Sequence, residues 1–339
     1  MTTPNAPASP LASTPPLISD AAGPTVHTNR VQPAERYAMT SLWEVIRFNH
    51  DIPTWFGVGG RADRFAEPLD ENMTRDLLLA FAGHTVRVLG DGANLLVADD
   101  GADGLVLSLD RLDSVQPLTE HNDADGSDAD TVVLRVGAGK NLPKLIVETV
   151  RDGLAGLEHL GGIPSSLGGA IVMNAGGAFG EIKSVVRSVR ALTRTGDLLD
   201  IPREEIDFGY RQSGLNHLVV LSADLELTRV PDAQRGPLRQ RLKDVMAYKK
   251  ETQPLGDRSA GCCFKNPGPG VSAGMLIERA GCKGLRIGGA EVSHRHANFV
   301  ITHQGCTAGH ILELLDEVAA RVRKVHSIDL QREVTIWKR

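Results

Sequence analysis

Three side chains in the second half of the sequence could do proton-transfer and ion-pair chemistry: Arg211, Cys262 and Glu333. A guanidinium can hold a carboxylate through parallel hydrogen bonds and can stabilise an enolate. A thiol has an ordinary pKa of about 8.5, so at neutral pH it is a competent proton donor. Each residue also has a plainer interpretation: a solvated arginine, a buried structural cysteine, and an exposed strand glutamate. Their residue types alone leave both interpretations open.

Glycine is the over-represented residue type, at 36 of 339 residues, and it gathers in three segments with small polar neighbours. The segments are 57–60, 90–97 and 161–176. The second follows a predicted strand, where backbone N–H groups can bind a phosphate. Taken singly, each segment is more simply a turn. Three of them within one span, with Ser165, Ser166 and Asn174 adding side-chain donors, favour a large phosphate-bearing cofactor.

Several better-known motifs are absent or lack their context. Residues 57–62 match G-x-G-x-x-A, but neither a preceding strand nor a following helix is predicted, so a Rossmann fold is not indicated. Residues 137–140 resemble only the end of a phosphate-binding Walker loop. The four cysteines show no zinc spacing, and His294 and His296 have no nearby partners, so no metal site is expected.

The elements that must position these side chains are mixed helices and strands without regular alternation, which indicates an α+β fold in several lobes. Helices are predicted at 70–82, from the cap Asn141 to 151, at 238–250, 275–280, and after the cap Thr307; strands are predicted at 85–90, 104–109, 131–136 and 328–337. Residues 231–237 are expected to form a polar connector, and residues 1–40, rich in proline and small residues, a disordered tail.

Composition limits the partners. Lys and Arg number 37 and Asp and Glu 42, a net charge of −5, and aromatic residues make up 4%, so neither nucleic acid nor a membrane is expected to bind. No apolar run approaches a membrane span, and no secretory or transit signal is evident at the N-terminus. A cytoplasmic location is therefore expected, while the oligomeric state is left open.

An ordered series of seven motifs resembles the UDP-N-acetylenolpyruvoylglucosamine reductase family. The motifs cover residues 54 to 334 and lie at 54–60, 89–97, 162–176, 208–213, 260–267, 288–299 and 332–334. Only 51 positions separate Arg211 from Cys262 (262 − 211 = 51), which resembles the compact second type of the family, without an inserted tyrosine-bearing loop.

The resemblance implies a three-lobed flavoenzyme. Residues 41–111 and 112–230 would form the two subdomains of an FAD-binding unit of the vanillyl-alcohol-oxidase type, and residues 238–339 the substrate-binding domain. FAD would be held non-covalently. NADPH would reduce it, and UDP-N-acetylglucosamine enolpyruvate would then accept the hydride and a proton to give UDP-N-acetylmuramate, a peptidoglycan precursor.

The resemblance also assigns roles to individual residues. Arg211 and Glu333 would act on the enolic intermediate and Cys262 would be the proton donor; Tyr210, Gln253, Lys265 and Asn266 would contact substrate. The flavin would contact Gly59, Gly60, Gly90, Gly92, Ala93, Asn94, Leu95, Ile163, Pro164, Ser165, Ser166, Gly168, Gly169, Asn174 and Gly176.

Cys262 is the main departure, because serine is usual at the donor position and cysteine is a variant. If residues 262 and 263 are extended, their side chains face opposite ways, and the motif register selects Cys262. An accessible thiol there is expected to react with iodoacetamide.

Two alternative functions are also compatible with the glycine segments: a flavin oxidoreductase with another substrate, and a catalytically silent flavin- or nucleotide-sugar-binding protein.

Overall fold

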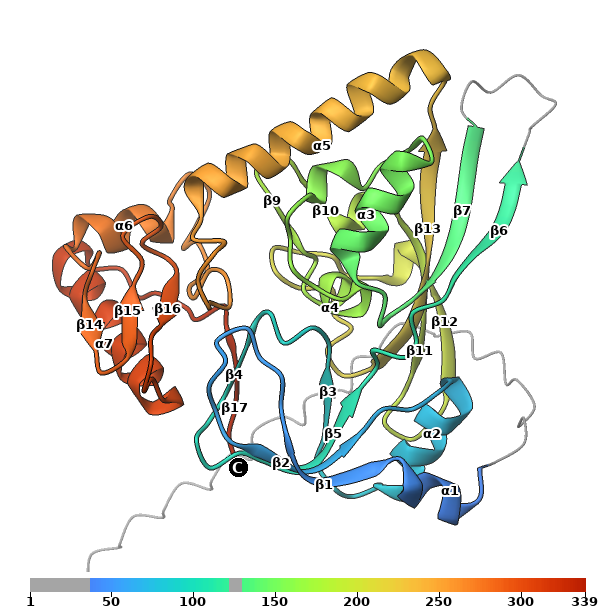
Figure 1. Cartoon of the computed structure of the whole chain (residues 1–339), viewed down its shortest axis with the longest axis horizontal. Helices are drawn as coiled ribbons and strands as arrows, with labels where there is room; N and C mark the ends of the chain where they lie inside the picture. Colours follow the sequence, from blue (N-terminus) through green and yellow to red (C-terminus); the bar gives the residue numbers. More distant parts are fainter. Residues whose placement is uncertain (1–36, 122–129) are drawn as a thin grey trace, which may run out of the picture.

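The computed structural model describes residues 37–121 and 130–339, which form three groups of elements (Figure 1). The tail expected at 1–40 lies outside the described residues up to position 36. Tyr37 is already fixed, because its N–H donates to Asp76 (2.8 Å) and its hydroxyl to Asp70 (2.6 Å). The patterned chain therefore begins a few residues earlier than its composition predicts. No helix in the described ranges is long and apolar enough to cross a membrane.

The first group is a four-stranded sheet in the order β1-β2-β5-β3, with two helices. Strands β2, β5 and β3 are parallel, and β1 is antiparallel to β2. Asp70 caps the second helix by accepting a hydrogen bond from the N–H of Met73 (2.8 Å). The bounds are α1 Met39–Glu44, β1 Ile46–Asp51, β2 Arg61–Ala66, α2 Glu71–Ala80, β3 Val86–Leu89, β4 Leu95–Val97 and β5 Ala102–Ser108.

The second group is an antiparallel sheet in the order β12-β11-β13-β7-β6, with β8 also pairing β13. Its helices α3 and α4 pack on one face (Figure 1). Asn141 caps α3, as the sequence predicts. The bounds are β6 Val115–His121, β7 Asp130–Gly137, α3 Leu142–Arg151, β8 Leu154–Ala155, α4 Leu167–Val172, β9 Gly176–Gly177, β10 Gly180–Glu181, β11 Val186–Leu192, β12 Leu198–Pro202 and β13 Val219–Arg229.

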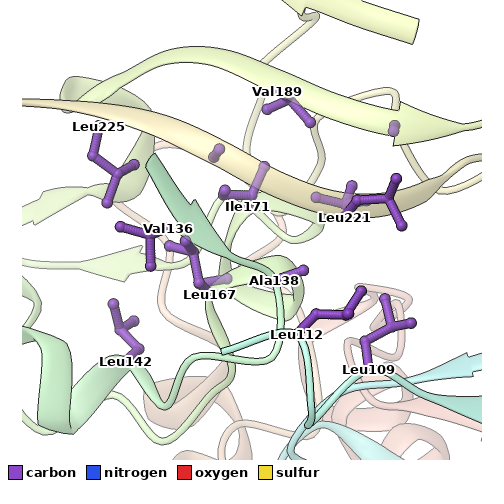
Figure 2. Close-up of a cluster of buried hydrophobic side chains, with 14 of the residues drawn as sticks. Leu109, Leu112, Val136, Ala138, Leu142, Leu167, Ile171, Val189, Leu221 and Leu225 are labelled. Atoms are coloured by element: carbon purple, nitrogen blue, oxygen red, sulfur yellow. The ribbon is translucent and has the colours of Figure 1, made fainter. Parts of the chain in front are cut away.

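One buried cluster joins these two groups. Figure 2 shows side chains of α4 and of strands β7, β11 and β13 facing Leu109 and Leu112, which lie between β5 and β6. Burying such aliphatic side chains stabilises the fold by roughly 1.5–3 kcal/mol each. The two groups therefore share a core, although their sheets are separate.

The third group contains α6 Ala273–Arg279, α7 Ala308–His326 and a small sheet of β14 Arg286–Ile287, β15 Ala290–Val292 and β16 Val300–Thr302. The long helix α5, Asp232–Thr252, runs from the second group to the third (Figure 1). The polar connector predicted at 231–237 is wrong, because α5 begins at Asp232. Pro237 is the sixth residue of the helix and lies inside it, so that one i→i−4 hydrogen bond is missing there.

The chain ends by returning to the first group. Strand β17, Thr335–Trp337, pairs in parallel with β4, so that Ile336 lies opposite Leu96. The sequence predicts a strand over 328–337, but only its last residues are extended in a ladder. Residues 330–333 instead contain one isolated bridge, between Arg332 and Phe264, and Glu333 lies just before the pairing begins.

A carboxylate of the first group caps a helix of the third. Asp99 accepts hydrogen bonds from the N–H groups of Ala308 and Gly309, both at 2.8 Å, at the start of α7. We expect Asp99→Ala to lower the free energy of unfolding by about 1–2 kcal/mol, since it removes the partner of two helix-end donors. Urea denaturation would measure this. Asp100→Ala, at the exposed neighbouring position, is the control and should change stability by less than about 0.5 kcal/mol.

Candidate active site

Arg211 lies in a tight turn that holds it in an unusual backbone conformation. Its φ is +56°, in the left-handed region that costs non-glycine residues roughly 1 kcal/mol. The turn closes through a hydrogen bond from the N–H of Gly209 to the carbonyl of Gln212 (3.0 Å). The Asn174 amide donates to the Gly209 carbonyl (2.9 Å) and so fixes the turn from the preceding segment. The strain is therefore sustained by surrounding contacts, as is common at functional sites.

Cys262 lies on an irregular segment that forms an isolated bridge with Phe299 and whose backbone is clamped on one side. The side chain of Asn298 accepts a hydrogen bond from the N–H of Phe264 (2.9 Å) and donates to its carbonyl (2.8 Å). Cys263 is 1% exposed and packs in the core of the third group, whereas Cys262 is only partly buried. The two adjacent thiols thus occupy different environments, and Cys262 is the one near Arg211 and Glu333.

Glu333 is held between two segments by its backbone. Its N–H donates to the carbonyl of Cys263 (2.7 Å), and its carbonyl accepts from the amide of Asn94 (3.2 Å). The N–H of Thr335 donates back to the carbonyl of Asn94 (3.0 Å), which starts the β17–β4 pairing. The predicted flavin residue Asn94 therefore positions the loop that carries Glu333.

The Arg211 and Glu333 side chains form a largely buried ion pair, with Nε and Oε1 2.6 Å apart. Burial raises the pKa of Glu333, although the nearby charges of Arg211 and Lys265 oppose that rise. Burial alone lowers the pKa of Arg211, yet the Glu333 carboxylate holds it above its ordinary value. Because Nε is engaged with Glu333, the rest of the guanidinium is available to bind an anionic group of a ligand.

The Cys262 thiol stays protonated across the physiological pH range. Burial, with a smaller contribution from Glu333, raises its pKa to about 12. At pH 8 only about one thiol in 10⁴ is then ionised. The expected reaction of Cys262 with iodoacetamide stays a prediction, and the raised pKa favours a slow reaction, since alkylation requires the thiolate.

The predicted substrate residues are only partly brought together. The half-exposed Tyr210 accepts a hydrogen bond at its hydroxyl from the N–H of Asn266 (3.1 Å), which links the arginine turn to the cysteine segment. The positive charge of Lys265 lies near enough to Glu333 to oppose the rise in the pKa of that carboxyl. Gln253 lies at the C-terminal end of α5, and within the described ranges no hydrogen bond or ion pair of its side chain joins it to the others.

The predicted flavin segments converge in space. A Cβ on Gly59 would lie 2.4 Å from the carbonyl oxygen of Val97, and one on Gly90 would lie 2.5 Å from the hydroxyl of Ser166. In the described part of the chain, the N–H groups of Asp91, Gly92 and Ala93 have no acceptor. Consecutive free N–H groups of this kind can hold a phosphate, so the residues present fit a diphosphate-bearing cofactor.

Other predicted flavin residues have structural partners. Ser166 caps α4, and Ser165 donates to the Ser166 carbonyl (2.8 Å). Asn174 is fully buried and also donates to Glu181 (3.1 Å), while Gly176 pairs with Glu181 in the β9–β10 hairpin. Gly60, Leu95, Ile163, Pro164, Gly168 and Gly169 lie on the same segments. Their contact with flavin stays a prediction.

Among the described residues no group of three or more His, Cys, Asp or Glu side chains could hold a metal ion.

Sequence reasoning missed two residues of this region. Asn298 clamps the cysteine segment, and the motif that contains it predicts no role for it. Lys249 is 8% exposed, near Arg211. A signal for Lys249 exists, because Leu238, Leu242 and Val245 are spaced on one helical face, and Lys249 takes the next position of that face.

Comparisons with known proteins agree with this geometry. Residues 62–202 match a family model described as an FAD binding domain, and residues 253–337 match the C-terminal domain of UDP-N-acetylenolpyruvoylglucosamine reductase. A reductase of that name from Heliobacterium modesticaldum is 40% identical over 287 residues, 84% of this chain and 87% of its own. One from Nitratidesulfovibrio vulgaris is 39% identical over 289 residues, 84% of this chain and 94% of its own.

The crystal structure of the reductase from Thermus caldophilus is similar, with a TM-score of 0.69 and 35% identity over 84% of this chain and 96% of that one. The two family models together include the glycine segments at 90–97 and 161–176 and the region of Cys262 and Glu333. The chain therefore belongs to the UDP-N-acetylenolpyruvoylglucosamine reductase family and is an FAD-containing oxidoreductase.

Proposed function

We propose that this protein uses NADPH to reduce UDP-N-acetylglucosamine enolpyruvate to UDP-N-acetylmuramate in peptidoglycan precursor synthesis. The observation that carries the proposal is the buried Arg211–Glu333 pair beside a protonated Cys262, supplied by three separate segments. Family membership and the FAD-binding domain support it. Bound FAD would supply the hydride, and the protein must hold the alkene, stabilise charge and deliver a proton.

Arg211 would bind the substrate carboxylate. Hydride addition to the vinyl carbon leaves a carbanion next to that carboxylate, and its charge spreads onto the carboxylate oxygens. The guanidinium is already aligned by Glu333, so it can stabilise the growing charge with little reorganisation. Burial strengthens this interaction, because the local dielectric is below that of water.

Cys262 would protonate the carbanion. Its raised pKa keeps the thiol protonated at every physiological pH. Because the protonated thiol is neutral, it does not place a second negative charge beside Glu333. The proton moves from Sγ to the carbon, and solvent returns a proton to the thiolate afterwards. The nearby positive charge of Arg211 stabilises that transient thiolate.

The decisive experiment follows flavin absorbance without oxygen. Adding NADPH to the purified flavoprotein should bleach the flavin band, and adding the enolpyruvyl substrate should restore it in one turnover. A flavin oxidoreductase with another substrate would bleach but not recover. A silent binding protein would do neither, and either of these results would exclude the proposed reaction.

A further inference from the structure

Lys249 carries a charge that the described protein does not balance. It lies in the last turn of α5, the residue is 8% exposed, and among the described residues its ammonium has no hydrogen-bond or ion-pair partner, although Nζ keeps some accessible surface. Its stem packs along the glycine turn before α4, where a Cβ on Gly162 would lie 3.2 Å from its Cδ. Buried ammonium groups are normally paired, because removing their hydration is costly.

The surrounding charges make this position more unfavourable for a cation. Arg211 is close enough to repel the ammonium, and its own carboxylate partner, Glu333, is already engaged. Among the described residues, α3 and the turn at 158–160, which pack against α5, offer no unpaired carboxylate: Glu158 pairs with Arg241 and Glu148 with Lys140. Arg151 pairs with Asp152, and His159 lies against the carbonyl of Glu181.

We infer that Lys249 is an oxyanion-binding residue for the nucleotide-sugar substrate, acting beside Arg211. The inference rests on the proposed function and adds a second cation to its substrate site. The substrate has two oxyanion sources, the enolpyruvyl carboxylate and the diphosphate. Both would give the buried ammonium the partner that the protein lacks, through a charge-assisted hydrogen bond.

This role predicts a pH dependence with a defined sign. Burial, aided by the charge of Arg211, lowers the pKa of Lys249 to about 8 in the substrate-free protein. The ammonium form binds the oxyanion, so substrate affinity should be highest below pH 8 and fall as the pH rises above it. Cys262, with a pKa of about 12, does not titrate in this range.

The first test separates a binding role from a structural one. An unpaired, largely buried charge that serves substrate binding destabilises the substrate-free protein. Lys249→Met should therefore raise the urea midpoint of the FAD-containing, substrate-free protein at pH 7. Lys250→Met, on the exposed neighbour, should leave the midpoint unchanged. A lower midpoint for Lys249→Met would show that the lysine supports the fold and would overturn the inference.

The second test measures affinity by titration calorimetry. Lys249→Met should weaken binding of the enolpyruvyl substrate by roughly 10- to 100-fold, and Lys249→Arg should keep the affinity and lose the decline above pH 8. If the decline in affinity above pH 8 came from titration of the substrate itself, it would appear with both wild type and Lys249→Arg. UDP-N-acetylglucosamine, which has the diphosphate without the carboxylate, identifies the source: equal weakening indicates the diphosphate, and no weakening indicates the carboxylate.

The outcomes also distinguish this inference from the proposed function. If wild type does not bind or reduce the enolpyruvyl substrate, the proposed function fails. If wild type turns over but Lys249→Met binds both ligands as tightly, the inference alone fails. It also fails if Lys249→Met loses FAD or slows only reduction by NADPH, because the lysine would then serve another ligand.

Discussion

Arg211→Met is expected to slow reoxidation of the reduced flavin by the enolpyruvyl substrate by roughly 10²- to 10³-fold, the usual effect of removing a donor to a developing oxyanion. Reduction by NADPH should survive, because that half-reaction forms no enolate. Glu333→Gln should act in the same direction, since the 2.6 Å contact that aligns the guanidinium would weaken. Stopped-flow absorbance of each half-reaction measures both effects.

The chain offers a matched control in the ion pair between Arg187 and Glu226, which is more than half exposed. Arg187→Met should leave both half-reactions unchanged, because exposed pairs contribute little. Arg211→Met also leaves the Glu333 carboxyl buried, where it would take up a proton and limit the loss of stability. Equal slowing of both half-reactions, with FAD retained, would exclude a specific role of the pair on substrate.

Cys262→Ala is expected to reduce the substrate-driven half-reaction by roughly 10²- to 10⁴-fold, because the carbanion would lose its proton donor. Cys262→Ser should retain activity within about tenfold, since a hydroxyl is also protonated and can occupy the same place. Cys263→Ala should be kinetically mild and cost about 1 kcal/mol of stability through a small core cavity. Flavin reoxidation rates of the three variants distinguish the two thiols.

Iodoacetamide provides an independent measurement on the same residue. Because burial raises the pKa of Cys262 to about 12, inactivation at pH 8 should be far slower than for a free cysteine. Fast inactivation that Cys262→Ser abolishes would contradict the raised pKa. If Cys263→Ala, rather than Cys262→Ala, stops flavin reoxidation, the donor is Cys263.

The sequence was sufficient for the α+β fold and the capped helices α3 and α7, whereas the roles of the predicted site residues stay predictions. It failed where long-range contacts decide the structure. Helix α5 continues through Pro237 and its polar first turns because Leu238 and Leu242 find a core to pack against. The boundary predicted at 111/112 stays a prediction, because Leu109 and Leu112 contribute to one core that spans both sheets.

In the candidate site, too, adjacent residues predict some features, whereas others depend on residues far away in the sequence. Adjacent cysteines in extended backbone indicated that only one faces the ligand, and the burial of Cys263 agrees. The raised pKa of Cys262 depends first on burial and then on Glu333, 71 positions away (333 − 262 = 71), so a local pattern does not predict it. Lys249 was missed because a lysine on a helix is usually solvated, although its place on the apolar face was visible.

The parallel pairing of β17 with β4 has a consequence for how the chain is made on the ribosome. Strand β4 is complete at residue 97, but its partner begins only at residue 335, which is 238 positions later (335 − 97 = 238). At about 5–20 residues per second, β4 waits on the order of 10–50 s with an unpaired edge and with Leu96 exposed. The β4 region of a nascent chain is thus unfinished until β17 has been synthesised. We expect chaperones that shield apolar edges to matter more for its yield than for its final stability.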